Sequence, residues 1–149
     1  MAHLTIIAGL PGSGKSTLID CIAAEYDGVV AHDVMDGAPS PEFTASLHYA
    51  KLIRDLRDGK RCLIADVVFC DPSKRNTAKR IVTGLVPGVV FDEKFFSNEL
   101  DACLANIEER VRKYPRNKEF EIQVAQELTQ IYVIPDGVFP IPVYRPEKA

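Results

Sequence analysis

The sequence is poor in several features that define whole classes of protein. No apolar run approaches the roughly 18 residues that a membrane-spanning helix needs, so we expect no membrane span. The N-terminal residues show no basic segment followed by an apolar stretch and a cleavage site, and we expect no secretory signal. Four cysteines are scattered without a Cys-x-x-Cys pair, which argues against a disulfide framework or a zinc site. Reduced thiols and a cytoplasmic location are therefore predicted.

Basic residues are not in excess either. The net charge is −3 and the isoelectric point is about 5.6, so the chain as a whole lacks the positive field of a nucleic-acid-binding protein. What is present is an ordinary globular composition, with 46% hydrophobic and 26% charged residues among 149. That length predicts a single domain over 1–149 with one core.

Short apolar runs alternate with stretches of helical periodicity. The runs predict strands at 4–8, 28–31, 61–66 and 89–91. The periodic stretches predict helices that begin at Lys15 and then cover 40–59, 71–83, 98–114 and 121–132. Four prolines between 135 and 146 predict an edge strand or irregular chain at the end. Strands that alternate with helices in this way predict an α/β fold of three layers, with a mainly parallel sheet covered by helices on both faces.

The strongest motif lies between the first predicted strand and the first predicted helix. Residues 9–17 read Gly-Leu-Pro-Gly-Ser-Gly-Lys-Ser-Thr, which matches the Walker A or P-loop pattern G-x-x-x-x-G-K-[ST] in the context that the pattern requires. The glycines let backbone N–H groups turn onto a phosphate, and the following helix points its positive end at the same place. A Gly-rich turn that matches by chance is the minor alternative.

This motif predicts a site for ATP and Mg²⁺. The residues expected to bind the nucleotide are Leu10, Pro11, Gly12, Ser13, Gly14, Lys15, Ser16 and Thr17. Lys15 would carry its charge to the β- and γ-phosphates, and the Ser16 hydroxyl would be a ligand of Mg²⁺.

Carboxylates follow two other predicted strands. Asp66 ends the third strand, where the binding edge of an open α/β sheet lies, and is a candidate second anchor for Mg²⁺; a simple turn cap is the alternative. Asp33 follows the second strand and is the candidate base that accepts the proton of an attacking hydroxyl. Asp36 is a weaker candidate because Asp36-Gly37 reads as a turn, and His32 should point away from Asp33 because side chains alternate along a strand.

Basic residues cluster where the fourth predicted helix ends, at Arg110, Arg112, Lys113, Arg116 and Lys118. They predict a lid over about 105–120 that closes on ATP and brings a guanidinium to the transferring phosphoryl group. The alternative is a solvated helix end whose cations complement the helix dipole, with Glu108 and Glu109 as ion-pair partners.

With these residues assembled, the chain resembles the small P-loop kinases, the group of polynucleotide kinase, adenylylsulfate kinase, gluconate kinase and zeta-toxin-like enzymes. The resemblance implies that Asp33 contacts the acceptor hydroxyl. Several members carry an Arg-Asn-x-x-Arg pattern on the lid-side helix, where this chain reads Ala105-Asn106-Ile107-Glu108-Glu109-Arg110. The pattern favours Arg110 as the lid arginine, with Arg112 or Arg116 as a substitute, and the Pro-rich end is expected to replace a regular fifth strand.

The function predicted from these features is an ATP-dependent transfer of phosphate to a hydroxyl of a small molecule, a nucleotide or a nucleic acid. Lys15, Asp33, Arg110 and Arg112 are the expected catalytic residues. A nucleotide-binding module or sensor with little activity is the alternative. A switch GTPase is disfavoured, because Asn117-Lys118-Glu119-Phe120 fails the guanine-reading motif at its last position. An acceptor phosphate or nucleic acid end would have to use Lys74 and Arg75, with Lys79 and Arg80.

Overall fold

The computed structural model describes residues 2–26, 28–33, 47–113 and 118–144. Its strands are β1 (His3–Ala8), β2 (Val29–Asp33), β3 (Arg61–Ala65) and β4 (Val90–Phe95). Its helices are α1 (Lys15–Glu25), α2 (Leu47–Arg57), the short 3-10 helix η2 (Val67–Cys70), α3 (Pro72–Leu85), α4 (Leu100–Lys113) and α5 (Lys118–Ile131). Within these ranges, no helix has both the length and the apolar character to cross a bilayer.

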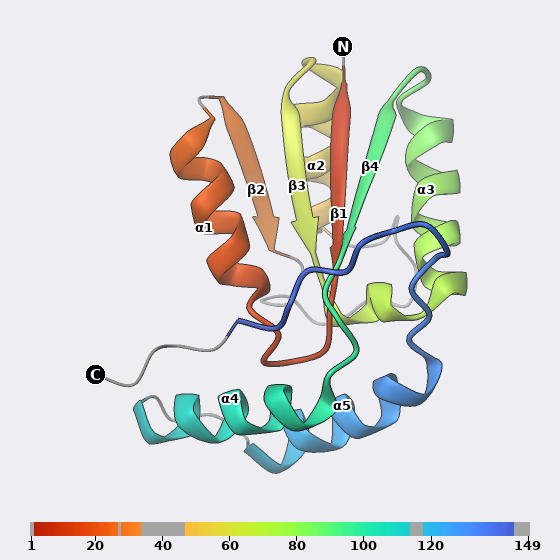
Figure 1. The fold of residues 1–149 in the computed structure, drawn as a ribbon. Helices are drawn as coiled ribbons and strands as arrows, with labels where there is room; N and C mark the ends of the chain where they lie inside the picture. The colour runs from red at the N-terminus through yellow and green to blue at the C-terminus, as the bar shows by residue number, and fades with distance from the viewer. Residues whose placement is uncertain (1, 27, 34–46, 114–117, 145–149) are drawn as a thin grey trace.

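The strands form one parallel sheet in the order β2-β3-β1-β4. Residues that alternate along β1 face opposite layers. Leu4 and Ile6 pack with residues of α2 and α3, whereas Ile7 packs with Leu18 and Ile19 of α1. Figure 1 shows α2 and α3 on one face of the sheet and α1 on the other. The predicted α/β fold, with helices on both faces of a parallel sheet, is therefore confirmed.

The larger part of the core lies between the sheet and the layer of α2 and α3. Leu52 and Leu56 of α2 and Val82 of α3 are almost completely buried there. The layer of α1 is thinner, because no residue of that helix is fully buried and its contacts with the sheet come from Leu18 and Ile19. Three of the four cysteines are buried, Cys21 is exposed, and all four are free thiols.

Several predicted boundaries shift by a few residues. β2 continues to Asp33, so this aspartate is the last strand residue rather than the first residue after the strand. β4 runs to Phe95, four residues past its predicted end, and its charged residue Glu93 is paired with Lys79 of α3 at 2.8 Å. The predicted start of the second helix at Ser40 lies outside the described residues. The 3-10 helix η2 was not predicted.

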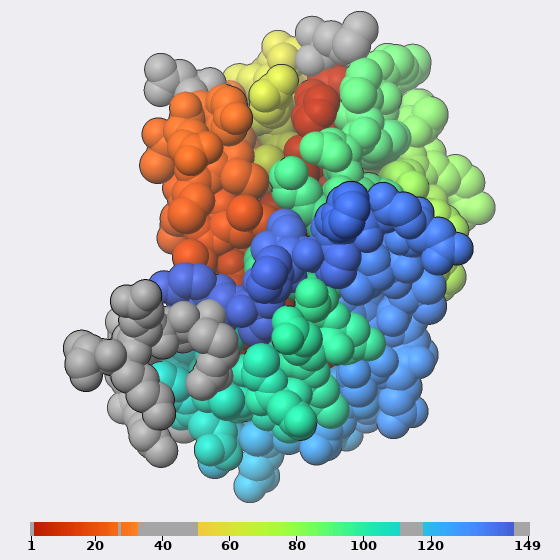
Figure 2. Space-filling view, viewed as in Figure 1, coloured from red at the N-terminus to blue at the C-terminus, as the bar shows by residue number. Residues whose placement is uncertain are grey.

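Up to residue 144, where the described part of the chain ends, the Pro-rich tail forms no regular strand, in agreement with the prediction. There it makes one parallel bridge, Phe96 to Ile141, beyond the end of β4. From there it crosses in front of the carboxyl ends of β4 and β1 and reaches the first turn of α1 (Figure 1). Figure 2 shows the same segment on the surface between α1 and the pair of helices α4 and α5. The tail therefore lies directly against the segment that carries the P-loop motif.

Candidate functional site

The P-loop motif forms the turn between β1 and α1, at the carboxyl edge of the sheet. Gly12 and Gly14 have φ angles of 84° and 108°, a region that residues with a side chain rarely adopt. Gly14 is the N-cap of α1 and has no side chain to cap the first turn of that helix. The first N–H groups of an α-helix have no partner within the helix and carry its positive dipole end. The loop therefore has the backbone shape and polarity of an anion-binding site.

Lys15 lies folded over this loop. Its Nζ donates to the carbonyls of Gly9 at 2.8 Å and Leu10 at 2.9 Å, and it lies 3.4 Å from the Ser13 hydroxyl. Burial lowers the pKa of Lys15 from 10.5 to about 8; the Asp66 carboxylate opposes the shift, and the Arg110 guanidinium adds to it. Burial also raises the pKa of Cys70 to about 12 and of Cys103 to about 11. Both thiols therefore stay neutral near pH 7.

Asp66 and Asp33 lie at the same edge of the sheet as the loop. Asp66 is buried, and its Oδ1 accepts from the backbone N–H of Val68 at 2.9 Å as the N-cap of η2. The turn cap that was the alternative interpretation is thus present. A carboxylate has about four lone-pair positions, so this cap does not use up its capacity to bind a metal-bound water. In the parallel register Asp33 pairs with Ala65, so the ends of β2 and β3 bring the two aspartates side by side along the backbone.

Arg110 belongs to α4, which lies with α5 beyond the carboxyl ends of the strands (Figure 1). Its guanidinium is close enough to Lys15 to contribute to the pKa of that lysine. Its Nη2 lies 3.5 Å from Oε1 of Glu121 on α5. Asp66 and Arg110, from two other parts of the chain, thus both lie within electrostatic range of Lys15.

Comparisons with known proteins agree with this geometry at the level of the fold. Neither a protein-family model nor a curated protein matches the sequence. Among solved structures, a gluconokinase from Sinorhizobium meliloti 1021 superposes with a TM-score of 0.60 at 15% identity, over 97% of this chain and 84% of that chain. The chain has the fold of the small P-loop kinases.

Two further solved structures share this fold. APE1195 superposes with a TM-score of 0.59 at 24% identity, over 97% of this chain and 85% of that chain. A chain of the Pnkp1/Rnl/Hen1 RNA repair complex superposes with a TM-score of 0.61 at 17% identity, over 87% of this chain. This chain spans only 45% of that larger chain.

Other residues of the candidate site predicted from the sequence are placed less completely. The backbone of Asp33 and of Arg112 is described, but their side chains are not among the described ones. Asp36 and Arg116 lie outside the described residues. Arg75, suggested as a ligand for an acceptor phosphate, is buried instead: it donates to the carbonyls of Phe69 and Val133 and lies over the ring of Phe95. That guanidinium belongs to the core, and an acceptor phosphate has no access to it there.

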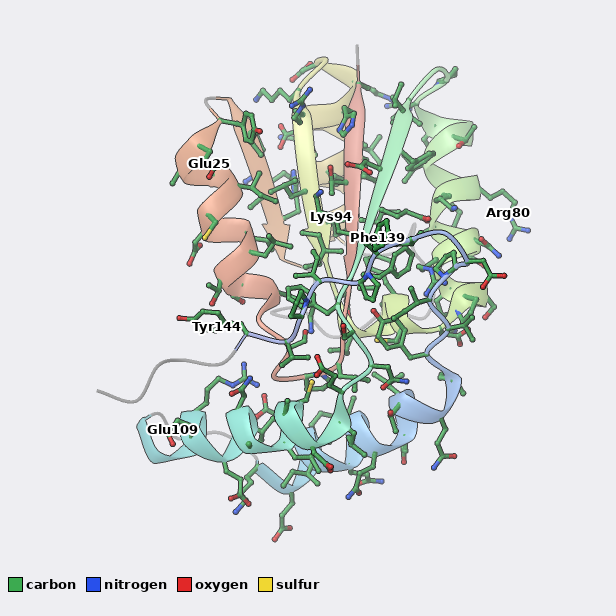
Figure 3. All side chains as sticks on the ribbon, in the orientation of Figure 1. Glu25, Arg80, Lys94, Glu109, Phe139 and Tyr144 are labelled. Atoms are coloured by element: carbon green, nitrogen blue, oxygen red, sulfur yellow. The ribbon has the colours of Figure 1, made fainter. Side chains whose placement is uncertain are left out.

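Three residues around the P-loop were not given a role from the sequence. Glu121 holds Arg110, Tyr144 lies beside the start of α1 (Figure 3), and Asn106 reaches from α4 to the loop. Only Asn106 carried a signal in the sequence, because it precedes Arg110 by four residues and so shares its helix face. The other two come into contact through the packing of α5 and the tail, which no local pattern records.

Proposed function

We propose that this protein transfers the γ-phosphate of ATP, bound with Mg²⁺, to a hydroxyl group. The observation that carries the proposal is that Asp66 and Arg110 both lie within electrostatic range of Lys15, the first residue of α1, whose N-terminus has no side-chain cap. A loop that only bound an anion would need the helix end and the lysine. The additional carboxylate and guanidinium match the two further demands of phosphoryl transfer, a metal anchor and a positive charge for the transition state.

The residues present fit ATP and Mg²⁺. The N–H groups of the loop and of the first turn of α1 would hold the phosphates, and Lys15 would exchange its carbonyl partners for phosphate oxygens. Ser16, at the second position of α1 and exposed, and Asp66 would hold Mg²⁺, an ion that is usually bound by few protein ligands together with phosphates and water. Bound there, the ion supplies charge neutralisation at the phosphate oxygens.

The chain's own residues would carry the transfer. Asp33 would accept the proton of the acceptor hydroxyl as its oxygen attacks the γ-phosphorus and the bond to ADP breaks. Arg110 would stabilise the charge spread over the transferring phosphoryl group, with Arg112 as the second candidate. The neighbours suggest two acceptor classes, since one is named a gluconokinase and another an RNA repair complex. We therefore propose a sugar acid or a nucleic acid end as the first acceptors to try.

The test is transfer of labelled γ-phosphate from ATP to a panel of acceptors, comparing the native chain with Asp33→Asn. We expect the variant to bind ATP with unchanged affinity and to lose transfer. Transfer by Asp33→Asn at the native rate would remove Asp33 from the mechanism. The alternative function is a nucleotide-binding module, which the uncharged Ala105 at the first lid position favours. ATP binding without consumption across the whole panel would support that alternative.

A further inference from the structure

Asn106 on α4 makes an unusual pair of contacts with the P-loop and the tail. Its side chain is buried, and its Nδ2 donates to the carbonyl of Gly12 at 2.8 Å and to the carbonyl of Tyr144 at 2.5 Å. Both partners are acceptors, so the amide nitrogen and not the amide oxygen must face them. A single side chain thus joins three segments that are far apart in the sequence: the loop, α4 and the tail.

The loop needs such a donor because of its shape. When backbone N–H groups turn inward onto an anion, carbonyls of the same loop point outward and must find donors elsewhere. The carbonyls of Gly9 and Leu10 accept from Lys15, and that of Ser13 accepts from the N–H of Tyr144 at 3.0 Å. Lys15 is also the group that would turn to a phosphate. The contact from Asn106 to Gly12 does not compete with a phosphate in this way.

Close packing leaves the loop little freedom on this side. A Cβ atom added to Gly12 would lie 2.5 Å from the carbonyl oxygen of Cys103 and 3.1 Å from a side-chain carbon of Ile107. A Cβ atom added to Gly14 would lie 2.6 Å from Cβ of Tyr144. The loop is therefore held between the backbone of α4 and the tail, and Asn106 is the polar link at that junction.

We propose that Asn106 is a positioning residue that keeps the P-loop in its phosphate-binding conformation by linking it to α4 and the tail. The inference rests on the nucleotide binding of the proposed function and not on phosphoryl transfer. The P-loop holds the phosphates of the nucleotide and not its base. Loss of the link should therefore weaken the binding of any ligand that carries the same phosphate chain.

The test compares Asn106→Ala with Asn98→Ala as a matched control. Asn98 also donates its Nδ2 to a backbone carbonyl, that of Thr129 at 2.9 Å, but it links the segment before α4 to α5 rather than to the loop. Titration calorimetry would give the Kd for ATP with Mg²⁺ and for inorganic tripolyphosphate, and urea unfolding would give stability. We expect both variants to lose stability. Only Asn106→Ala should raise both Kd values, by about tenfold or 1.4 kcal/mol.

Three results would overturn the inference: Kd values of Asn106→Ala within twofold of native, an equal rise in Asn98→Ala, or a rise for ATP without one for tripolyphosphate. If Asn106→Ala does not fold, Asn106→Asp replaces it, because it keeps the volume and turns carboxylate oxygens toward the two carbonyls. The same rise in Kd is expected. A native chain that binds neither ligand would refute the proposed function as well, whereas unchanged variants refute the inference alone.

Discussion

Arg110 on α4 and Glu121 on α5 form an ion pair, with Nη2 and Oε1 3.5 Å apart. The side chain of Glu121 is more buried than that of Arg110. The ion pair therefore restrains the guanidinium on its inner side, while part of the arginine side chain stays exposed to solvent. Held in this way, Arg110 loses less conformational entropy when it meets a phosphate than an unrestrained arginine would. Arg110 is thus prepared for the transition-state role proposed for it.

The first prediction concerns this arginine. Arg110→Ala should lower kcat by about 10³-fold, the lower end of the range for a transition-state arginine, while the Kd for ATP changes far less. Steady-state transfer kinetics with the best acceptor would measure both effects. Arg54→Ala is the control, because Arg54 is exposed on α2 and has no role in the proposed site. A kcat of Arg110→Ala within fivefold of native would exclude the role.

The second prediction separates the two uses of Asp66. Asp66→Asn keeps an oxygen that can accept from Val68 N–H, so the cap of η2 should survive and stability should change little. The negative charge is lost, so a higher Mg²⁺ concentration should be needed for half-maximal transfer. Asp71→Asn is the control: Asp71 caps α3 through Ser73 N–H in the same way, at 2.9 Å. Equal Mg²⁺ dependence of the two variants would leave Asp66 with a capping role only.

The fold could be predicted from the sequence because its signals are local. Apolar runs of a few residues that end in Gly or Asp mark buried parallel strands, and the P-loop pattern fixes the turn from β1 into α1. The end of β4 was missed for a physical reason. Asp92, Glu93 and Lys94 interrupt the apolar run on which the strand prediction depends. They continue the strand because β4 pairs with β1 and Glu93 has Lys79 as its partner.

Residues of the candidate site could be predicted only where a local motif or a strand end determines their position. The loop motif and the strand end predict the positions of Lys15 and Asp66, and the structure has Lys15 as the first residue of α1 and Asp66 directly after β3. Their roles at the site stay predictions. Arg75 was misjudged because a charged residue in the first turn of a helix normally faces solvent. Its burial depends on the carbonyl of Val133, 58 residues away, which no local pattern contains.

The third prediction concerns pH. His32 is buried at the end of β2, with its Nε2 3.2 Å from Oδ2 of Asp55, which Lys60 also contacts. Burial lowers the pKa of His32 below 6.5, with Asp55 opposing and Lys51 adding to the shift. The unfolded chain then binds more protons than the folded chain as pH falls through 6.5. Stability should therefore be full above pH 6.5 and decrease below it, toward the lowered pKa of the folded chain.

Urea unfolding between pH 5 and pH 7.5 would test this expectation. His32→Asn should flatten the dependence on pH over that interval, because the titrating group is gone. Asp55→Asn should steepen it, because the carboxylate that favours the charged imidazole is removed. If the free energy of unfolding changes with pH by the same slope in the native chain and in His32→Asn, other groups determine the acid sensitivity of the fold.

The last prediction tests whether Arg75 supports the fold or binds an acceptor. Its guanidinium donates to Phe69 O at 2.5 Å and to Val133 O at 3.2 Å, and it lies 4.8 Å from the centre of the Phe95 ring. Arg75→Ala would leave two carbonyls in the interior without this donor and remove the contact with the ring. The free energy of unfolding should therefore fall by about 3 kcal/mol or more.

Lys74→Ala is the neighbouring control, since Lys74 is exposed in the same helical turn and its loss should change stability by less than about 0.5 kcal/mol. Urea unfolding measures both changes, and KM for the acceptor is determined under conditions in which each variant is folded. If Arg75 only supports the fold, the KM of Arg75→Ala for the acceptor should stay near the native value. A large rise in that KM with little loss of stability would return Arg75 to the acceptor site and contradict its place in the core.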